Sequence, residues 1–367
     1  MKAELWTKET SKALKTVAVA IDARPVIPAA AGIQIDAEPD GTVWLTATNG
    51  RYEVRQKVNG NVTEEGRTLL DGKRLVQMFG SMSGESVTID AGSGKAATLK
   101  SKGARFTTPE IIGEIPQKQA VNKAVAATAE ISALELKQSL ENVKYAISID
   151  ETRMVLTGVL MQIRDGNVTF VALDGFRMGV SRKTAETSNE MDIIIPSGTV
   201  TQIIAMCADT EASVFMETDG KALHVMADNA EITSTLLSGE FMDYKSVIPK
   251  DGKTSIRFDR WTFAEALKRA MISASKGNLM KVIIRDGEME IRSNDPVSTF
   301  TEIIPCQKMG EDVETAYNIR YAIDVMNAIH TDDVQLDLSG TSRPGLLKPV
   351  DGGKELHVLL PVRVVNE

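Results

Sequence analysis

Alternating apolar and polar residues recur three times along the 367-residue chain in one fixed pattern. Each copy begins at a glycine, continues with apolar or small residues at every second position, and ends on an acidic or amide residue. Alternation with a period of two is typical of a half-buried strand, and the glycine is typical of a hairpin turn. The copies, which begin 125 and 121 residues apart, are Gly41, Val43, Leu45, Ala47, Asn49; Gly166, Val168, Phe170, Ala172, Asp174; and Gly287, Met289, Ile291, Ser293, Asp295.

A helical pattern follows each strand copy at a similar distance. Its apolar residues have the i, i+3, i+4, i+7 spacing of one helix face: Leu75, Met78, Phe79, Met82; Val200, Ile203, Ile204, Cys207; and Ala322, Val325, Met326, Ile329. An earlier helix also recurs, as Leu136, Leu140, Val143, Ile147 and Phe263, Leu267, Ala270, Ala274, with a weaker first copy at Leu14, Val17, Ile21. Two element types that share one period indicate repeated domains.

We therefore expect an α+β fold of three homologous domains, each with two helices packed on antiparallel β-sheets. Two polar, turn-rich stretches separate them: Pro116 to Thr128, and Pro249 to Lys253. These place the domains at residues 1–120, 127–249 and 251–367. The length agrees, because single hydrophobic cores stop growing at about 250–300 residues.

Composition excludes several classes of protein. The longest uncharged stretch, Ile193 to Ala208, is interrupted by polar residues, so no membrane span is expected. The charged N-terminus does not resemble a signal peptide. Two cysteines give no disulfide framework, which favours a cytoplasmic location. The net charge of −8 argues against a generic nucleic-acid binder, which carries a basic surplus.

No catalytic constellation stands out. The run Gly92, Ser93, Gly94, Lys95 resembles part of a phosphate loop, but Ile89 and Ala96 occupy the other key positions, so a hairpin turn is the better interpretation. The three histidines are far apart and form no metal-spaced set with the cysteines; they are His224, His330 and His357. Cys207 lies on an apolar helical pattern and is expected to be an inert core residue.

Five longer segments are more specific: Tyr145 to Gly158; Ala172 to Met178; Phe241 to Tyr244 with Val247 to Pro249; Tyr321 to Ala328; and Leu360 to Val364. In this order they resemble motifs of the bacterial sliding clamps, the β subunit family of DNA polymerase III. Arg24-Pro25 and the segment at Arg105-Phe106 are similar to features of that family's first domain. The resemblance covers essentially the whole chain.

The resemblance implies a head-to-tail homodimer that closes into a six-domain ring around duplex DNA, with helices lining the hole. Such a clamp tethers the replicative polymerase and other proteins that carry clamp-binding peptides, and an ATP-dependent clamp loader opens it. It implies no intrinsic catalysis, no cofactor and no metal. It also implies a cytoplasmic protein, associated with the nucleoid during replication.

The distribution of charge along the chain agrees better with a ring around DNA than the net charge of the whole chain does. The predicted helical windows carry a net charge of +7, so the remaining residues carry −15. The windows are residues 8–21, 72–82, 132–148, 197–208, 260–276 and 317–330. Basic helices would attract phosphates without reading sequence.

By resemblance, the DNA-facing residues are Arg24, Lys73 and Arg153, with the adjacent Arg74. Asp150 and Val155 stand where some members have polar or aromatic DNA contacts, and Ser197-Gly198 replaces a stretch that is often basic. These departures weaken the second domain's expected share of DNA contact.

The resemblance also implies a groove for a partner peptide that carries a glutamine and two or three hydrophobes. Its matching residues are Leu156, Leu173, Gly175, Phe176, Arg177, Met178, Met242, Val247, Tyr321, Leu360, Pro361, Val362 and Arg363. Met242 stands where proline is usual, Ser246 where a basic residue can occur, and Val365 to Glu367 extend past the usual C-terminal hydrophobe.

For the dimer interface, Arg74, Phe106 and Ile272 match contact positions, and Ser273 stands where an apolar residue can occur. Two other hypotheses remain open at this point. One is a triplicated β-rich structural or scaffold protein that does not bind DNA. The other is an enzyme with an unrecognised carboxylate site.

Overall fold

A computed structural model describes residues 1–22, 24–92, 94, 96–116, 121–124, 126–207, 211–350 and 353–362. The predicted repeat is present in it. The three predicted strands are β3 (Thr42–Thr48), β11 (Asn167–Leu173) and β20 (Glu288–Asn294). The predicted helices are α1 (Thr7–Ala18), α2 (Gly72–Ser81), α3 (Ala133–Lys144), α4 (Ser197–Met206), α5 (Arg260–Ile272) and α6 (Ile319–Ala328).

The last apolar residue of each helical pattern lies just beyond the helix itself. Cys207 follows α4 directly, and its N–H still donates to the carbonyl of Ile203 at 3.0 Å. Ile21 lies three residues past α1, where it packs close to Gly72 at the start of α2. The helix patterns were therefore correct in face but too long at the C-terminal end, because apolar burial continues into the following turn.

The chain forms two compact units, the first with one antiparallel sheet and the second with two. The first unit comprises residues 1–137, 185–191 and 198–236, and its strands run in the order β13-β9-β15-β16-β17-β4-β1-β6-β7-β8, with β3 paired to β4, β2 to β3 and β5 to β2. They are β1 (Lys2–Trp6), β2 (Gly32–Ala37), β4 (Tyr52–Glu64), β5 (Gly66–Asp71), β6 (Ser86–Asp90), β7 (Ala96–Ser101), β8 (Ala104–Pro109), β9 (Ala127–Ser132), β13 (Glu186–Ser188), β15 (Ser213–Thr218), β16 (Ala222–Ala227) and β17 (Ala230–Thr235).

The second unit comprises residues 138–184, 192–197 and 237–367. It holds a nine-stranded sheet, β14-β10-β11-β12-β26-β25-β24-β18-β22, and a four-stranded sheet, β21-β20-β19-β23. The strands are β10 (Gly158–Arg164), β12 (Arg177–Thr184), β14 (Met191–Pro196), β18 (Thr254–Asp259), β19 (Leu279–Arg285), β21 (Thr299–Pro305), β22 (Gln307–Gly310), β23 (Val313–Asn318), β24 (Asp333–Leu338), β25 (Gly345–Pro349) and β26 (Glu355–Leu359).

The middle repeat contributes strands to both units, because backbone hydrogen bonds join it to the first and third repeats. We call the β17–β4 pair the 1–2 seam and the β12–β26 pair the 2–3 seam. The two seams use equivalent strands with the same register. In the 1–2 seam Glu231 faces Arg55 and Thr233 faces Glu53; in the 2–3 seam Leu356 faces Val180 and Val358 faces Met178.

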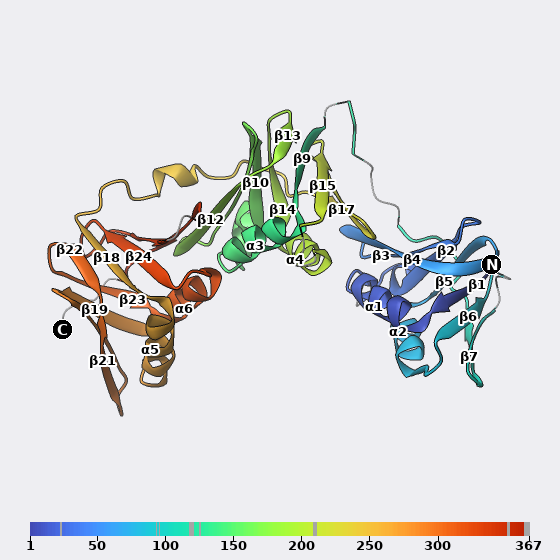
Figure 1. The fold of residues 1–367 in the computed structure, drawn as a ribbon, viewed down its shortest axis with the longest axis horizontal. Coiled ribbons are helices and arrows are strands. Elements are labelled where there is room, and N and C mark those ends of the chain that lie inside the picture. Colours follow the sequence, from blue (N-terminus) through green and yellow to red (C-terminus); the bar gives the residue numbers. More distant parts are fainter. Residues whose placement is uncertain are drawn as a thin grey trace. The chain divides into compact units, whose positions relative to one another are not determined.

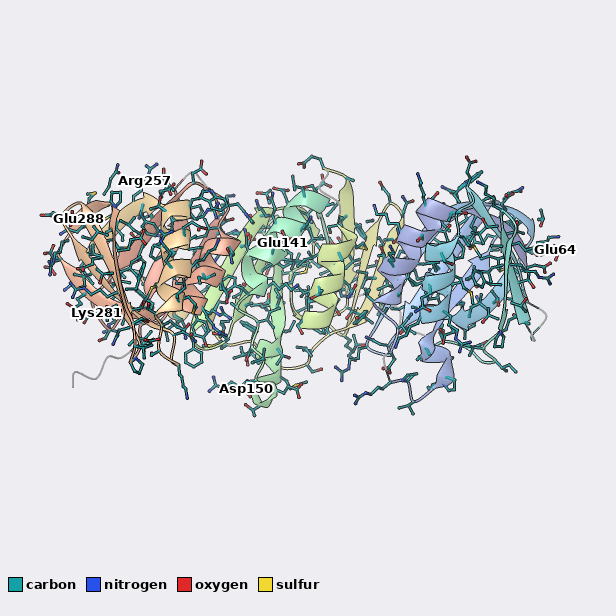
Figure 2. All side chains as sticks on the ribbon, turned by 90° about the horizontal axis from the view of Figure 1, so that it is seen from below. Glu64, Glu141, Asp150, Arg257, Lys281 and Glu288 are labelled. Carbon is teal, nitrogen blue, oxygen red and sulfur yellow. The ribbon has the colours of Figure 1, made fainter. Side chains whose placement is uncertain are left out.

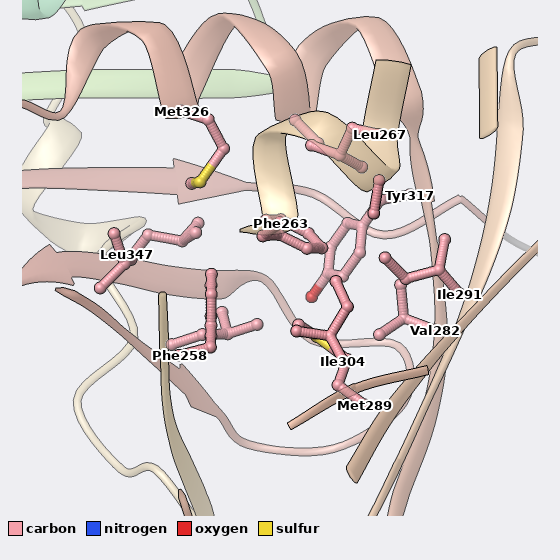
Figure 3. Close-up of a cluster of buried hydrophobic side chains, with 14 of the residues drawn as sticks. Phe258, Phe263, Leu267, Val282, Met289, Ile291, Ile304, Tyr317, Met326 and Leu347 are labelled. Carbon is pink, nitrogen blue, oxygen red and sulfur yellow. The ribbon is translucent and has the colours of Figure 1, made fainter. Parts of the chain in front are cut away.

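The helices of the first and third domains lie on one face of their sheets (Figure 1). In the third domain, side chains from α5 and α6 pack with those of the surrounding strands into one apolar core (Figure 3). Phe258 and Phe263 meet edge to face, 4.9 Å between ring centroids. Capping fixes where these helices begin: Asp259 accepts a hydrogen bond from the Thr262 N–H at 2.6 Å, and Asn318 does the same for α6. Within the described residues, no helix has the length and apolar character needed to cross a membrane.

Candidate functional site

A buried apolar cluster on the helix-free face of the 2–3 seam contains part of the predicted groove. Leu156, Leu173 and Met178 are buried in it, and Leu360 packs against it. Residues 177, 179 and 181 of β12 point to the other face, where Gly179 lies directly against the backbone of α3. Strand alternation therefore gives the helix-free face a continuous apolar floor.

The segment that connects the second and third domains runs over this floor. Phe241 and Ile248 pack on it, and Tyr244 of the short helix η3 (Tyr244–Ser246) is buried in it. The Tyr244 hydroxyl donates to Oε1 of Gln162 at 2.8 Å. Burial raises the pKa of Tyr244, so its hydroxyl stays protonated as a donor. This anchor holds the connecting segment beside the predicted site.

The rim of the groove leaves large apolar side chains exposed. Phe176 is 56% exposed although its ring stacks on that of Tyr321 at 5.8 Å. Met242 and Val362 are exposed as well, and Val247 is half-buried. Exposed apolar side chains around an apolar floor are a common feature of peptide-docking sites.

The Arg177 side chain is largely buried and paired, so it is not exposed in the groove for direct contact with a ligand. Its side chain is 13% exposed and forms ion pairs with Asp174 at 3.0 Å and with Asp324 of α6. The guanidinium lies 4.4 Å from the ring centroid of Tyr321 and 5.4 Å from that of Tyr145. Burial lowers the pKa of Arg177, but the two carboxylates more than offset this and keep it above the usual value. Arg177 thus ties the turn of the second domain to the helix of the third.

The turn that presents Phe176 is built locally. The Asp174 carboxylate accepts hydrogen bonds from the N–H groups of Phe176 at 2.9 Å and Arg177 at 3.0 Å. Gly175 between them has φ +91°, a conformation that favours glycine. The C-terminal strand continues past this turn, because the Leu360 N–H donates to the Phe176 carbonyl at 2.9 Å. Pro361 follows and is half-buried. Arg363 and the extension Val365 to Glu367 lie outside the described residues.

A second layer of aromatic contacts supports Arg177 from the helix side. The Tyr145 hydroxyl lies 3.0 Å from the Met178 carbonyl and 2.9 Å from Nδ1 of His357. Burial holds the pKa of His357 at about 3, so this histidine is neutral. The motif that contains Tyr145 is recognisable in the sequence, but the roles of Tyr145, Asp174 and Asp324 are not. No local pattern places these three side chains around one guanidinium.

The basic DNA-facing candidates lie on exposed positions. Lys73 and Arg74 occupy the first turn of α2, where Asp71 caps the helix by accepting from the Arg74 N–H at 2.8 Å. Arg24 is exposed in the loop after α1. Their positions fit solvent-facing contacts to phosphates, and this role remains a proposal.

Arg153 lies in a different environment. It is exposed within the 3-10 segment η2 (Glu151–Thr157), with non-helical backbone angles. The neighbouring Asp150 caps this segment, and hydrogen bonds from Thr152 hold its pKa below the usual value. Figure 2 shows Asp150 at the end of the extension that follows α3. A fixed negative charge beside Arg153 weakens this loop as a phosphate contact.

Sequence analysis treated the charges of α1 only as part of a helical window. The structure exposes Lys8, Lys12 and Lys15 along this helix, while Leu14 and Val17 are buried on its other side. The three-residue and four-residue spacing of the lysines was the available signal. In α5, by contrast, Arg269 is paired with Glu302 through bonds of 2.8 and 2.6 Å. The net charge of residues 260–276 therefore overstates the positive charge of α5 that is available to DNA.

The dimer candidates occupy one sheet edge, β8, and the ends of two helices, α2 and α5. Phe106 is half-buried in β8, and Arg74 is exposed on α2. Ile272, the last residue of α5, is 81% exposed, whereas the following Ser273 is buried. β8 ends the thirteen-stranded sheet and β21 ends the four-stranded one, so each has an edge without a strand neighbour in the described residues.

The Cys207 thiol and the glycine run that begins at Gly92 lie in separate parts of the fold. Burial raises the pKa of Cys207 to about 12, as expected for a core thiol. Gly92 and Gly94 have positive φ values in the connection between the paired strands β6 and β7, while Ser93 and Lys95 lie outside the described residues. Among the described residues, no group of three or more His, Cys, Asp or Glu side chains could hold a metal ion.

Three repeats of two helices on antiparallel sheets define a clamp-type fold. Three family models match the chain in succession: the N-terminal domain of the DNA polymerase III beta subunit at residues 1–116, its central domain at 130–243, and its C-terminal domain at 245–363. The chain therefore belongs to the DNA polymerase III beta subunit family.

Individual relatives agree over nearly their whole length. The beta sliding clamp of Rickettsia bellii is 26% identical and is covered completely, with 99% of this chain. That of Staphylococcus aureus is 25% identical over 94% of both chains. The solved DNA polymerase III beta subunit of Thermotoga maritima is 25% identical, with a TM-score of 0.91 over 99% of this chain and all of that one. The sliding clamp of Bacillus subtilis, at 22% identity, shares the fold with a TM-score of 0.92 over all of both chains.

Proposed function

We propose that the protein is a DNA sliding clamp: a homodimeric ring that encircles duplex DNA and tethers the replicative polymerase. The observation that carries the proposal is the edges of β8 and β21, which have no strand neighbour among the described residues. Both internal seams join a strand equivalent to β8 to a strand equivalent to β21. A second copy, placed head to tail, can repeat this pairing twice and so satisfy both edges by closing the ring.

The internal seams also predict the register of this third seam. Ala104 begins its strand after the β7 hairpin as Ala230 begins β17, and Ala230 faces Gln56 in the 1–2 seam. Transferred through the repeat, Ala104 faces Glu302 of the partner subunit. Phe106 then faces Phe300 of the partner subunit. An aromatic pair at this position would add about 0.5–1.5 kcal/mol beyond its buried area.

The exposed lysines of α1 and the basic first turn of α2 support the DNA-binding part of the proposal. Phosphate contacts of this kind hold a duplex without selecting a sequence. They leave the ring free to slide. The acidic remainder of the chain discourages DNA binding elsewhere on the surface.

The groove at the 2–3 seam supports the tethering part. A floor of buried apolar side chains and a rim of exposed ones suit a short peptide with one or two apolar anchors. We assign this groove to the polymerase and to other clamp-binding proteins. An ATP-dependent loader that opens the ring, a cytoplasmic location with nucleoid association, and the absence of intrinsic catalysis belong to the same proposal.

A topological experiment tests the function. The protein is loaded onto nicked circular DNA with a cognate clamp loader, and the circle is then cut at one site. A ring that encircles DNA slides off when ends appear, so the bound fraction should fall to background. Retention on linear DNA, or failure to load, contradicts the proposal and favours a β-rich scaffold that does not encircle DNA.

A further inference from the structure

The helix-free face of the first domain carries a groove of about 700 Å³. Strands β2 to β5 form its floor, and residues 114 and 115, in the segment that follows β8, form part of its wall. A volume of this size is typical of ligand sites and far exceeds what a single ion fills. Nothing in the proposed clamp function uses this surface.

This groove occupies the place that corresponds to the partner groove in the second domain. One cross-strand row has the same register in both domains: Gln34, Thr46 and Arg55 in the first, and Leu160, Val171 and Val180 in the second. The neighbouring pair also corresponds: Thr48 with Glu53, and Leu173 with Met178. The two grooves therefore share a backbone frame and differ in chemistry.

The charge of the first-domain groove is predominantly negative. Its lining holds five carboxylates and two arginines: Asp36, Glu38, Glu53, Glu65 and Glu114, with Arg55 and Arg67. Both arginines are already engaged, Arg67 with Asp36, and Arg55 with Glu231 at 3.1 Å and over the ring of Trp44. Glu38, Glu65 and Glu114 are exposed. The groove thus presents a surplus of acceptors to an incoming cation.

A second feature points independently to a ligand. Thr46 lines the groove, is only 3% exposed, and its Oγ1 has no hydrogen-bond partner among the described residues. The flanking Leu45 and Ala47 are buried in the core on the opposite face, so alternation directs Thr46 toward the groove. An unsatisfied buried hydroxyl costs about 1–3 kcal/mol. A donor from a bound chain would remove that cost.

We propose that this groove is a second docking site, for an extended basic peptide segment of a partner protein. Arginine or lysine side chains of the segment pair with the exposed carboxylates. A polar donor of the segment, from main chain or side chain, reaches Thr46. The site is specific for basic sequences, whereas the second-domain groove binds apolar ones. One subunit can therefore hold two classes of partner segment at once.

The test measures fluorescence anisotropy with a labelled octapeptide of alternating arginine and serine, at physiological salt, on the full-length protein. Glu65→Gln with Glu114→Gln should weaken binding about tenfold, since each exposed ion pair contributes up to about 1 kcal/mol. The matched control removes two exposed carboxylates outside the groove, by Glu186→Gln with Glu311→Gln, and should leave binding unchanged. Thr46→Val keeps the shape, removes the hydroxyl, and should weaken binding severalfold without lowering the melting temperature.

Three results would overturn the proposal. Equal loss in the groove pair and the control pair would show only general attraction to an acidic protein. Absence of binding at 100-fold molar excess of peptide would remove the site. Full competition by spermidine at equal concentration would assign the groove to polyamines rather than to a peptide.

Discussion

The 1–2 seam and the 2–3 seam are the same strand pair in the repeat, yet their helix-free faces differ. In the 2–3 seam the opposed residues are apolar, and they continue into a buried cluster under the connecting segment. In the 1–2 seam they are charged or polar, and Glu231 pairs with Arg55; His224 of the neighbouring strand β16 lies 3.4 Å from Glu217 and 3.8 Å from Glu231. One backbone arrangement thus supports an apolar groove in one place and an ionic ladder in the other.

The comparison explains why, among the described residues, this cross-strand row is apolar in the second domain and polar or charged in the first. In the third domain the corresponding row is Lys281, Arg292 and Thr301. Strand alternation alone permits any of the three rows to be apolar. The side chains chosen at these few positions decide which face can bind an apolar peptide, while the other rows keep charges that remain in contact with water.

Breaking the apolar floor should have the largest effect on binding. Leu173→Asp places a carboxylate in a buried cluster, so it should abolish binding of a glutamine-containing peptide with leucine and phenylalanine anchors. It should also lower the free energy of unfolding by about 3 kcal/mol. The dimer should persist, because Leu173 lies in the nine-stranded sheet, which contains neither β8 nor β21. Fluorescence anisotropy and sedimentation equilibrium measure the two outcomes.

The control for this variant is the equivalent residue of the other seam. Thr48→Asp changes a buried position of the first domain in the same register. It should cost stability and leave peptide affinity intact. Unchanged affinity in Leu173→Asp would show that the groove has been placed wrongly.

Ile272→Asp tests the third seam, the one that we propose forms between subunits. The side chain is exposed in the isolated subunit, so its stability should hardly change. A carboxylate in a closed interface should weaken dimerisation at least about 100-fold, or about 2.7 kcal/mol. Sedimentation equilibrium should show monomers at micromolar concentration. Ile149→Asp, at a 99% exposed position with no predicted interface role, should remain dimeric.

Arg177→Met tests whether Arg177 supports the groove indirectly or contacts the peptide directly. It removes the tie between Asp174 and Asp324 and should weaken peptide binding about tenfold. Asp324→Asn should weaken it less, and the double variant should be no weaker than Arg177→Met alone. Such non-additivity indicates that the two residues act through one contact. Additive losses would instead favour direct recognition of the peptide by Arg177.

The smallest effect concerns the pH dependence of the ionic seam. Hydrogen bonding to Glu231, opposed by partial burial and aided by Glu217, raises the pKa of His224 above 6.5. A raised folded pKa means that the stabilisation is complete below pH 6.5 and is lost as the pH rises through the folded value. Melting temperatures between pH 6 and 8 should fall in the parent protein and fall less in His224→Gln. An identical slope in both proteins would remove His224 as the cause.

The contribution of His357, in the 2–3 seam, to stability changes with pH in the opposite direction. Its pKa of about 3 means that the folded state holds it neutral, so its contribution is complete above pH 6.5 and is lost as the pH falls. The two seams should therefore respond to pH in opposite directions. Because His357 is present in both the parent protein and His224→Gln, its contribution cancels when the two slopes are compared.

The sequence determined the local elements and their repetition. Apolar spacing predicted β3, β11 and β20 and all six helices, because burial of one face imposes a period that a single strand or helix must satisfy. It erred at the helix ends, where the half-buried Ile21 and the buried Cys207 lie beyond the last helical residue. The motif match also predicted which segments form the groove, although they are far apart in the chain.

Only the tertiary structure decided which strands pair and what each side chain meets. It joined the middle repeat to both neighbours, and it enclosed Arg177 between Asp174, Asp324 and two aromatic rings. It also aligned Thr46 with Val171 as equivalent positions in opposite environments. These relations depend on pairing register between distant strands, and a one-residue shift would turn every side chain to the other face. Periodicity within a segment carries no information about that register.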